Sequence, residues 1–225
     1  MEKGFTLSTQ ISLTVLILVN LISIYGIIFL NWDPFIPLFS YLIELFIVFF
    51  YTFLKMIKVK YSGPSGNIFN TKVGRIIFFL IFTGLMLYII FILSLFSIGI
   101  FSIGWKPLIS EEKYGFNLIL LAICFFVSHG ISYSLNFIGK KEYNKLDVDS
   151  VGGMYIKRVI ATILIIMFSA PLVIGLGGII YRIFFTRILD PRLFMAYFYP
   201  IVIIIMKIIA DAYSHIQERI KSGSF

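Results

Sequence analysis

Charged residues are scarce in this 225-residue chain, and that scarcity excludes most soluble folds. Only 13% of the residues are Asp, Glu, Lys or Arg, whereas 60% are hydrophobic, and the mean hydropathy is +1.00. An ordinary soluble domain carries about 25% charged residues. A water-exposed surface cannot be built from so few, so lipid must be the main solvent around the protein.

Cysteine is nearly absent, because Cys124 is the only one and it lies inside an apolar run. A single cysteine excludes a disulfide framework and a cysteine-rich zinc site within the chain. We interpret Cys124 as a small packed hydrophobic residue. Acidic residues are outnumbered by basic ones, which gives a net charge of +8. The basic residues lie between apolar segments, so they favour a lipid bilayer and its anionic headgroups as partners and not nucleic acid.

Six apolar segments are long enough to span a hydrocarbon core of about 30 Å. They cover residues 7–30, 35–57, 75–104, 115–139, 158–183 and 192–219. The connections between them are too short for a second domain, and the sequence contains no internal repeat. The sequence therefore predicts an all-α fold, an integral membrane bundle of about six transmembrane helices that forms one domain over residues 1–225.

The distribution of positive charge predicts the orientation of this bundle. Most basic residues fall on one side if the N-terminus is cytoplasmic, chiefly Lys55, Lys58, Lys60, Lys72, Arg75, Lys140, Lys141, Lys145, Lys157 and Arg158. Cytoplasmic loops carry an excess of Lys and Arg. We therefore expect a multi-pass protein of the cell membrane with both termini cytoplasmic, although three arginines at 182–192 leave the side of the last connection open.

Three predicted spans carry ionisable side chains on one narrow face. These faces hold Ser40, Tyr41, Glu44, Tyr51 and Lys55 in the second span, His129, Ser132, Tyr133 and Asn136 in the fourth, and Lys207, Asp211, His215 and Glu218 in the sixth. Each set falls within a stripe roughly 120° wide or less at about 100° per residue. Glu44, His129 and Asp211 lie at matching depths, about 15–17 Å from the next basic anchor. Ionisable groups at that depth are costly and mark function.

Carboxylates and imidazoles at one depth suggest metal chemistry, because zinc, iron and manganese all accept nitrogen and oxygen ligands. We predict a divalent metal site formed by Glu44, His129, Asp211 and His215. A bound metal lowers the pKa of its water and can generate hydroxide. In that interpretation we predict three catalytic residues: Glu218 as metal ligand or proton acceptor, and Asn136 and Ser132, which orient either the substrate or the metal ligands.

Three classes of function stay open. The first is a metal-dependent intramembrane enzyme, a hydrolase or a lipid-modifying protein. The second is a non-catalytic subunit that assembles with partner membrane subunits. The third is an ion- or proton-coupled transporter that uses Glu44, Asp211 and His215 as a relay. The structural alternative is that these side chains only fasten helices together, for instance Lys207 pairing with Asp211 at i, i+4.

The order of these motifs resembles a family of small polytopic prokaryotic membrane proteins that is known only as a domain of unknown function. The similar segments are NWDPFIPLFSYLIELFIVFFYTFLKM, SHGISYSLNFI, a KR pair before the fifth span and K-x-x-x-D-x-x-x-H-x-x-E. The resemblance implies that family positions are occupied by Glu44, His129, Asn136, Arg158, Lys207, Asp211, His215 and Glu218. The third span and Ala161 depart from the family pattern, which has histidines there. The resemblance implies no activity.

Overall fold

The computed structural model describes residues 7–30, 32–33, 36–60, 71–102, 111–185 and 190–221. The long elements are α1 (Leu7–Phe29), α2 (Ile36–Lys58), α3 (Lys72–Ser102), α4 (Glu111–Ser132), α5 (Val148–Leu172) and α7 (Pro191–Lys221). The π-helix η2 (Tyr133–Ile138) continues α4 and is followed by the 3₁₀ turn η3 (Glu142–Asn144). Three short elements prolong α5, namely η4 (Val173–Gly177), α6 (Gly178–Ile180) and η5 (Tyr181–Phe185). The predicted all-α class is confirmed.

Among the residues that the structure describes, five helices are long and apolar enough to cross a membrane by length and composition. These segments are Leu7–Phe29, Phe39–Lys58, Lys72–Ile89, Gly115–Ile138 and Tyr197–Gln217. They correspond to five of the six predicted spans. The remaining span and the orientation of the bundle stay predictions.

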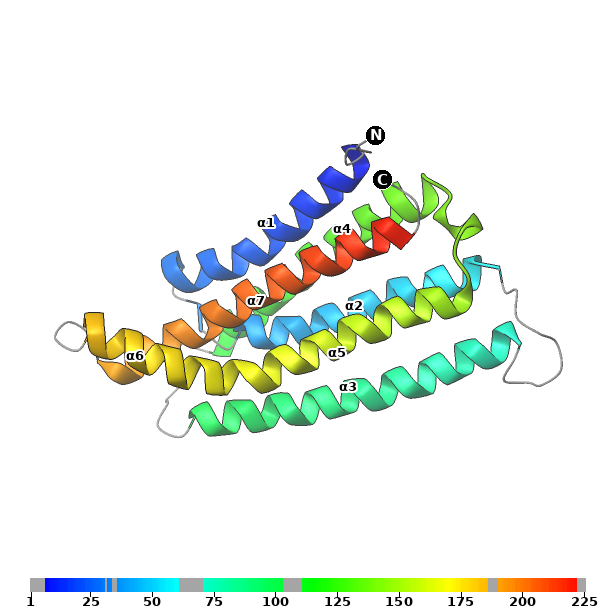
Figure 1. Ribbon diagram of the computed structural model, residues 1–225. Coiled ribbons are helices and arrows are strands. Elements are labelled where there is room, and N and C mark those ends of the chain that lie inside the picture. Colours follow the sequence, from blue (N-terminus) through cyan, green and yellow to red (C-terminus); the bar gives the residue numbers. More distant parts are fainter. Residues whose placement is uncertain are drawn as a thin grey trace.

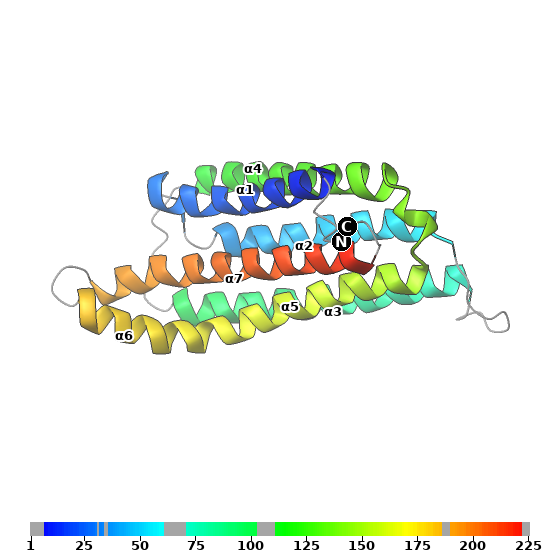
Figure 2. The same cartoon turned by 45° about the horizontal axis from the view of Figure 1, so that its top comes forward.

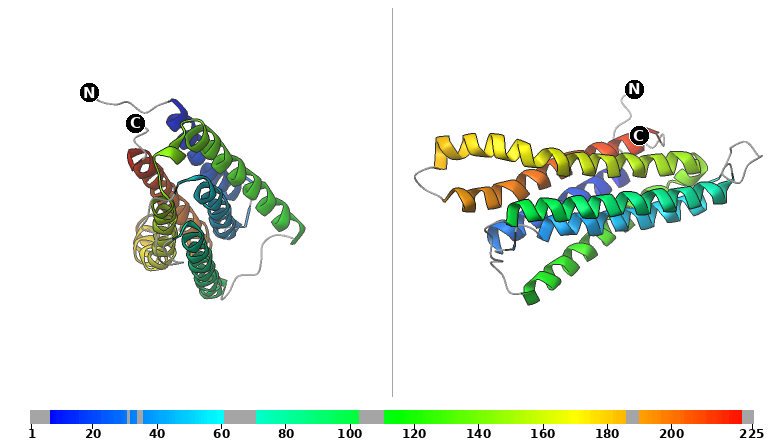
Figure 3. Two further views of the ribbon diagram at one scale, coloured as in Figure 1. Left: turned by 90° about the vertical axis from the view of Figure 1, so that its right-hand side faces the viewer. Right: turned by 90° about the horizontal axis from the view of Figure 1, so that it is seen from below.

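The long helices form a ring, and helices that follow one another in the sequence run in opposite directions (Figure 1). Helix α1 lies between α4 and α7, α2 lies between α4 and α3, and α5 closes the ring between α3 and α7. Helix α2 also contacts α5 and α7 across the ring, so it occupies the inner position (Figure 2, and end-on in Figure 3). Both termini lie at one end of the bundle, which we call the terminal end.

Large apolar side chains cover the outside of this ring. Helix α3 illustrates the pattern, since Ile77, Phe78 and Ile81 are exposed whereas Phe79 and Thr83 are buried. An exposed surface so rich in Phe, Ile and Leu is unfavourable in water and suits contact with lipid acyl chains. The fold thus indicates a multi-pass membrane protein.

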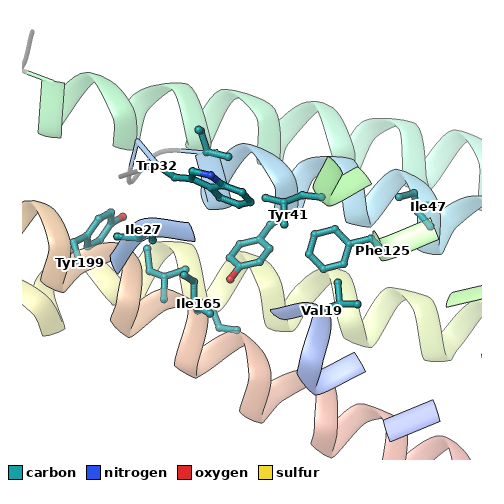
Figure 4. Packing of buried hydrophobic residues seen from close by; sticks show 12 residues of the cluster. Val19, Ile27, Trp32, Tyr41, Ile47, Phe125, Ile165 and Tyr199 are labelled. Atoms are coloured by element: carbon teal, nitrogen blue, oxygen red, sulfur yellow. The ribbon is translucent and has the colours of Figure 1, made fainter. Parts of the chain in front are cut away.

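Toward the end opposite the termini, the interior is filled by apolar side chains. Tyr41 and Phe125 lie in the middle of this cluster, and Trp32 lies near its outer limit (Figure 4). Trp32 packs directly on Gly26, where an added Cβ would lie 2.2 Å from the ring atom Cε3. Glycine is required at this position because only its lack of a side chain lets the indole approach the helix so closely.

The start of the fifth long helix differs from the prediction. We expected it at residue 158, after a connection over 140–153, but α5 already begins at Val148. Asp147 caps it, because the backbone N–H of Ser150 donates to Asp147 Oδ1 at 2.7 Å. A cap of this kind satisfies one of the N–H groups that a helix start leaves without a partner. The earlier start brings Tyr155 and Arg158 onto helix turns that face the ring interior.

Candidate functional site

A cluster of ionisable side chains lies inside the ring, between α2, α4 and α7. Lys207 Nζ is 2.9 Å from Glu44 Oε2 and also contacts the carboxylate of Asp211 one turn along α7. The other oxygen of Glu44 lies 3.2 Å from His129 Nε2. These four side chains, Glu44, His129, Lys207 and Asp211, are called the ion cluster below.

The ion cluster is held together by Lys207, which pairs with both of its carboxylates. The ammonium group of Lys207 lies between two carboxylates and stands 5.3 Å from the centre of the Tyr41 ring. Glu44, Lys207 and Asp211 are each only 2% exposed. Buried charges are tolerated when they are paired in this way, and removing one partner leaves the others uncompensated.

Nearer the terminal end, a second polar group links three helices through hydrogen bonds. Ser12 Oγ of α1 lies 3.0 Å from His215 Nε2 of α7, and Asn136 Nδ2 of η2 donates to Ser12 Oγ at 3.0 Å. We call Ser12, Asn136 and His215 the hydrogen-bonded chain. All three side chains are buried. Close by, Lys140 Nζ donates to Thr9 Oγ1 at 3.0 Å and ties α1 to the residues that follow η2.

The π-helical turn η2 sets the position of Asn136. The bond from Gly139 N–H to the Ser134 carbonyl, at 2.9 Å, spans five residues and not four. Such a turn inserts one extra residue, rotates the side chains after it and is frequent at functional sites. Asn136 therefore points at α1, and its Oδ1 has no hydrogen-bond partner among the described residues.

A polar cavity of about 50 Å³ opens beside both groups. Its side chains come from α1, α2, α4, α5 and α7 and from the turns between α4 and α5, so it lies inside the ring toward the terminal end. By this measure one water molecule needs roughly 10–15 Å³, so the cavity holds several waters or one small oxyanion.

The lining of the cavity combines cations with hydroxyl groups. Its titratable members are Lys55, His129, Glu142, Arg158 and His215, and its hydroxyl groups belong to Ser12, Tyr51, Thr52, Ser128, Ser132, Tyr133 and Tyr155. The Tyr155 hydroxyl is buried and has no hydrogen-bond partner among the described residues. A buried hydroxyl in that state can bind a water molecule or a ligand in the cavity.

The four predicted metal ligands are brought into one region but not into one coordination shell. Glu44 contacts His129, Asp211 is bound by Lys207, and His215 is hydrogen-bonded to Ser12. In the described part of the chain, no three His, Cys, Asp or Glu side chains are grouped so that they could hold a metal ion. The physical reason is Lys207, whose ammonium lies between the two carboxylates. Metal binding stays a prediction.

The three predicted catalytic residues have different outcomes. Asn136 is in the hydrogen-bonded chain, and Ser132 borders the cavity. Glu218 lies in α7, but its side chain is outside the described part of the structure. The roles assigned to these residues remain predictions.

Two functional positions were missed by the sequence analysis. Ser12 was overlooked because α1 reads as an apolar anchor, yet its buried polar residues share one stripe: Thr9, Ser12, Asn20 and Ser23. Their spacing of three, eight and three residues is a helical repeat and was available as a signal. Tyr155 was overlooked because it lay just outside the expected fifth span.

Together, the ring of apolar helices and its buried polar interior indicate a polytopic α-helical membrane protein with an internal polar site. The chain belongs to a family of unknown function, DUF6498, whose model matches residues 4–224. This confirms the resemblance seen in the sequence. No curated protein and no solved structure matches the chain.

Proposed function

We propose that this membrane protein binds a small anionic ligand in the cavity at its terminal end. One observation carries the proposal: the lining holds two permanent cations, two imidazoles and several hydroxyl donors but one carboxylate, that of Glu142. Lys and Arg side chains only donate hydrogen bonds. Such a lining is complementary to the oxygens of a phosphate or carboxylate.

Arg158 is the residue we expect to contribute most to anion binding. It is buried, at 7% exposure, and borders the cavity from α5, one helical turn after Tyr155. Its planar guanidinium can bind two oxygens of a phosphate or carboxylate at once. The neighbouring Tyr155 hydroxyl adds a donor that lacks a partner among the described residues.

Closure of the opposite end supports binding at one end over passage through the bundle. Beyond the ion cluster, apolar side chains such as Ile27 and Phe125 fill the ring (Figure 4). Transport needs access from both faces. The transporter and subunit interpretations remain predictions. In the described part of the chain, the cavity supports ligand binding more directly than any contact supports either of them.

Binding of inorganic phosphate and of dioctanoyl phosphatidic acid to the detergent-purified protein tests the proposal. The two probes share the oxyanion but separate a free ion from a lipid headgroup. We expect saturable binding of at least one by calorimetry, with affinity reduced about 10- to 100-fold in Arg158→Gln, because a charge-assisted hydrogen bond is worth about 1.5–3 kcal/mol.

The matched control is Arg182→Gln, which removes an arginine of η5 at the opposite end. It should bind both probes like the wild type. The proposal is contradicted if neither probe binds saturably. It is also contradicted if Arg158→Gln and Arg182→Gln lose affinity to the same extent.

A divalent metal is a second candidate ligand, favoured by the two imidazoles that border the same cavity. Glu44 contacts one ring nitrogen of His129. In metal sites, carboxylates often accept a hydrogen bond from the histidine nitrogen that does not bind the metal. In this arrangement His129 and His215 would bind the ion while Glu44 and Asp211 stay with Lys207. Elemental analysis of the purified protein tests it, and a wild type with no more zinc, iron or manganese than a His129→Ala/His215→Ala variant removes it.

A further inference from the structure

We propose that Ser12 is a nucleophile activated by His215, and that the site hydrolyses a carboxylic ester of an anionic lipid. This inference rests on the proposed binding of the anionic group in the cavity. The observation behind it is the juxtaposition of a serine hydroxyl and an imidazole, 3.0 Å apart, at the border of that cavity.

The hydrogen bonds around Ser12 suit proton transfer. Asn136 Nδ2 donates to Ser12 Oγ, so the serine oxygen accepts one bond and keeps its own proton to donate. Two acceptors compete for that proton: the Thr9 carbonyl at 3.2 Å and, with the imidazole proton on Nδ1, His215 Nε2 at the shorter distance of 3.0 Å. A hydroxyl is activated when an adjacent base can take its proton within hydrogen-bond distance.

The reaction needs no group beyond the substrate and water. Ser12 Oγ attacks the ester carbonyl carbon, a C–Oγ bond forms, and the Oγ proton passes to His215 Nε2. The ester C–O bond then breaks, and the leaving alcohol takes the proton from Nε2. Water repeats the sequence on the acyl-serine and releases the carboxylic acid and free Ser12.

Asn136 is a positioning residue for the Ser12 hydroxyl. Its Nδ2 donates to Ser12 Oγ at 3.0 Å, so one lone pair of that oxygen is occupied and its proton is left to be donated. Asn136 does not border the cavity, and its role is to orient Ser12. The π-helical turn holds Asn136 in this place.

The cavity lining indicates the substrate class. Arg158 and Lys55 supply cations for the anionic group, and Leu16, Val48 and Met154 supply apolar surface beside it. The outer surface of the ring is also apolar, so a lipid can approach the bundle from the bilayer. These features together favour an anionic lipid ester over a peptide bond.

Covalent labelling with an alkyl fluorophosphonate probe tests the proposal on the full-length protein in detergent. The probe phosphonylates activated serines, and mass spectrometry maps the modified residue. We expect modification of Ser12 in the wild type, none in Ser12→Ala, and a labelling rate at least 100-fold lower in His215→Gln. Ser214→Ala, which removes the neighbouring serine on α7, should label like the wild type.

Several results would overturn the proposal: no label on Ser12, a label on another serine only, or equal rates in the wild type and His215→Gln. Mapping of the label in the wild type decides the matter if His215→Gln does not fold, because it needs no variant. Binding of phosphate and phosphatidic acid, measured on the wild type and on Ser12→Ala, separates the two proposals. If the wild type binds either probe but Ser12 is not labelled, the nucleophile is rejected and the anion site is kept. If neither protein binds either probe, the anion site itself is rejected.

Discussion

The ion cluster and the hydrogen-bonded chain lie in the same ring of helices, but their polar atoms are satisfied in different ways. In the ion cluster, Lys207 contacts both carboxylates and His129 holds the remaining oxygen of Glu44. In the hydrogen-bonded chain, Ser12 and His215 border the cavity, whereas only His129 of the ion cluster does. A group held by ion pairs away from the cavity is suited to stability, whereas a group that borders the cavity is suited to a ligand.

The largest expected effect comes from breaking the ion cluster. Lys207→Met leaves Glu44 and Asp211 buried without their shared cation. Removing one member of a buried ion pair costs about 3–5 kcal/mol. We expect a large fall in the thermal stability of the detergent-purified protein, measured by intrinsic fluorescence.

Two further variants sharpen this test. Lys157→Met removes an exposed lysine on α5 and should change the stability little. The triple variant Glu44→Met/Lys207→Met/Asp211→Leu removes the charges together, and most of the lost stability should return, because replacement of a whole buried ion pair by apolar residues of similar volume is often tolerated. If the triple variant is no more stable than Lys207→Met alone, the cluster does not act through charge compensation.

A smaller effect is expected at the closed end of the ring. Gly26→Ala would place a Cβ 2.2 Å from Trp32 Cε3, and the rigid indole must move. Overpacking of this kind costs about 1–3 kcal/mol. The melting temperature should fall while the affinity for phosphate or phosphatidic acid is unchanged, since the cavity lies at the other end.

Gly84→Ala on α3 is the matched control, because an added Cβ there meets no atom within 4 Å. It should melt like the wild type. A change in anion affinity in Gly26→Ala would show that the two ends of the ring are coupled. Stability and ligand binding would then depend on the same region of the protein.

The sequence predicted which faces of the helices point inward better than it predicted which helices meet. Amphipathic spacing placed Glu44 and His129 on inward faces at one depth, and their direct contact agrees with this. The contact of Lys207 with Asp211 also follows from i, i+4 spacing alone. Spacing within a helix determines a face and a depth, and both can be calculated from residue numbers alone.

Contacts between helices could not be predicted in the same way. Nothing in the sequence states that α1 lies against α7, so the meeting of Ser12 with His215 was not foreseen. The π-helical turn that directs Asn136 toward α1 also has no sequence signal that we used. The structural alternative had Lys207 pairing along its own helix, but its second contact with Glu44 depends on how α2 and α7 pack.

The smallest effect is expected at the start of α5, which carries Tyr155 and Arg158 into the cavity. Asp147→Ala removes the helix cap and should cost about 1 kcal/mol. Hydrogen bonds from the hydroxyl and the backbone N–H of Ser150 hold the pKa of Asp147 below its usual value. The folded state therefore favours the ionised carboxylate, and its stabilising contribution is present above the unfolded-state pKa and is lost as pH falls through the lower folded-state pKa.

The difference in melting temperature between the wild type and Asp147→Ala should accordingly be full at neutral pH and should disappear under acid conditions that protonate the folded-state carboxyl. Asp149→Ala is the control. It removes another carboxylate from the same turn, one that forms an exposed ion pair with Arg75 at 3.5 Å. Exposed ion pairs of this kind contribute little to stability. Since the cap acts only on α5, Asp147→Ala should also weaken anion binding slightly.

Lys207→Met should lower the stability by the same amount in the wild type and in the Asp147→Ala background. A different loss in the Asp147→Ala background would mean that the cavity and the ion cluster form one cooperative unit and not two.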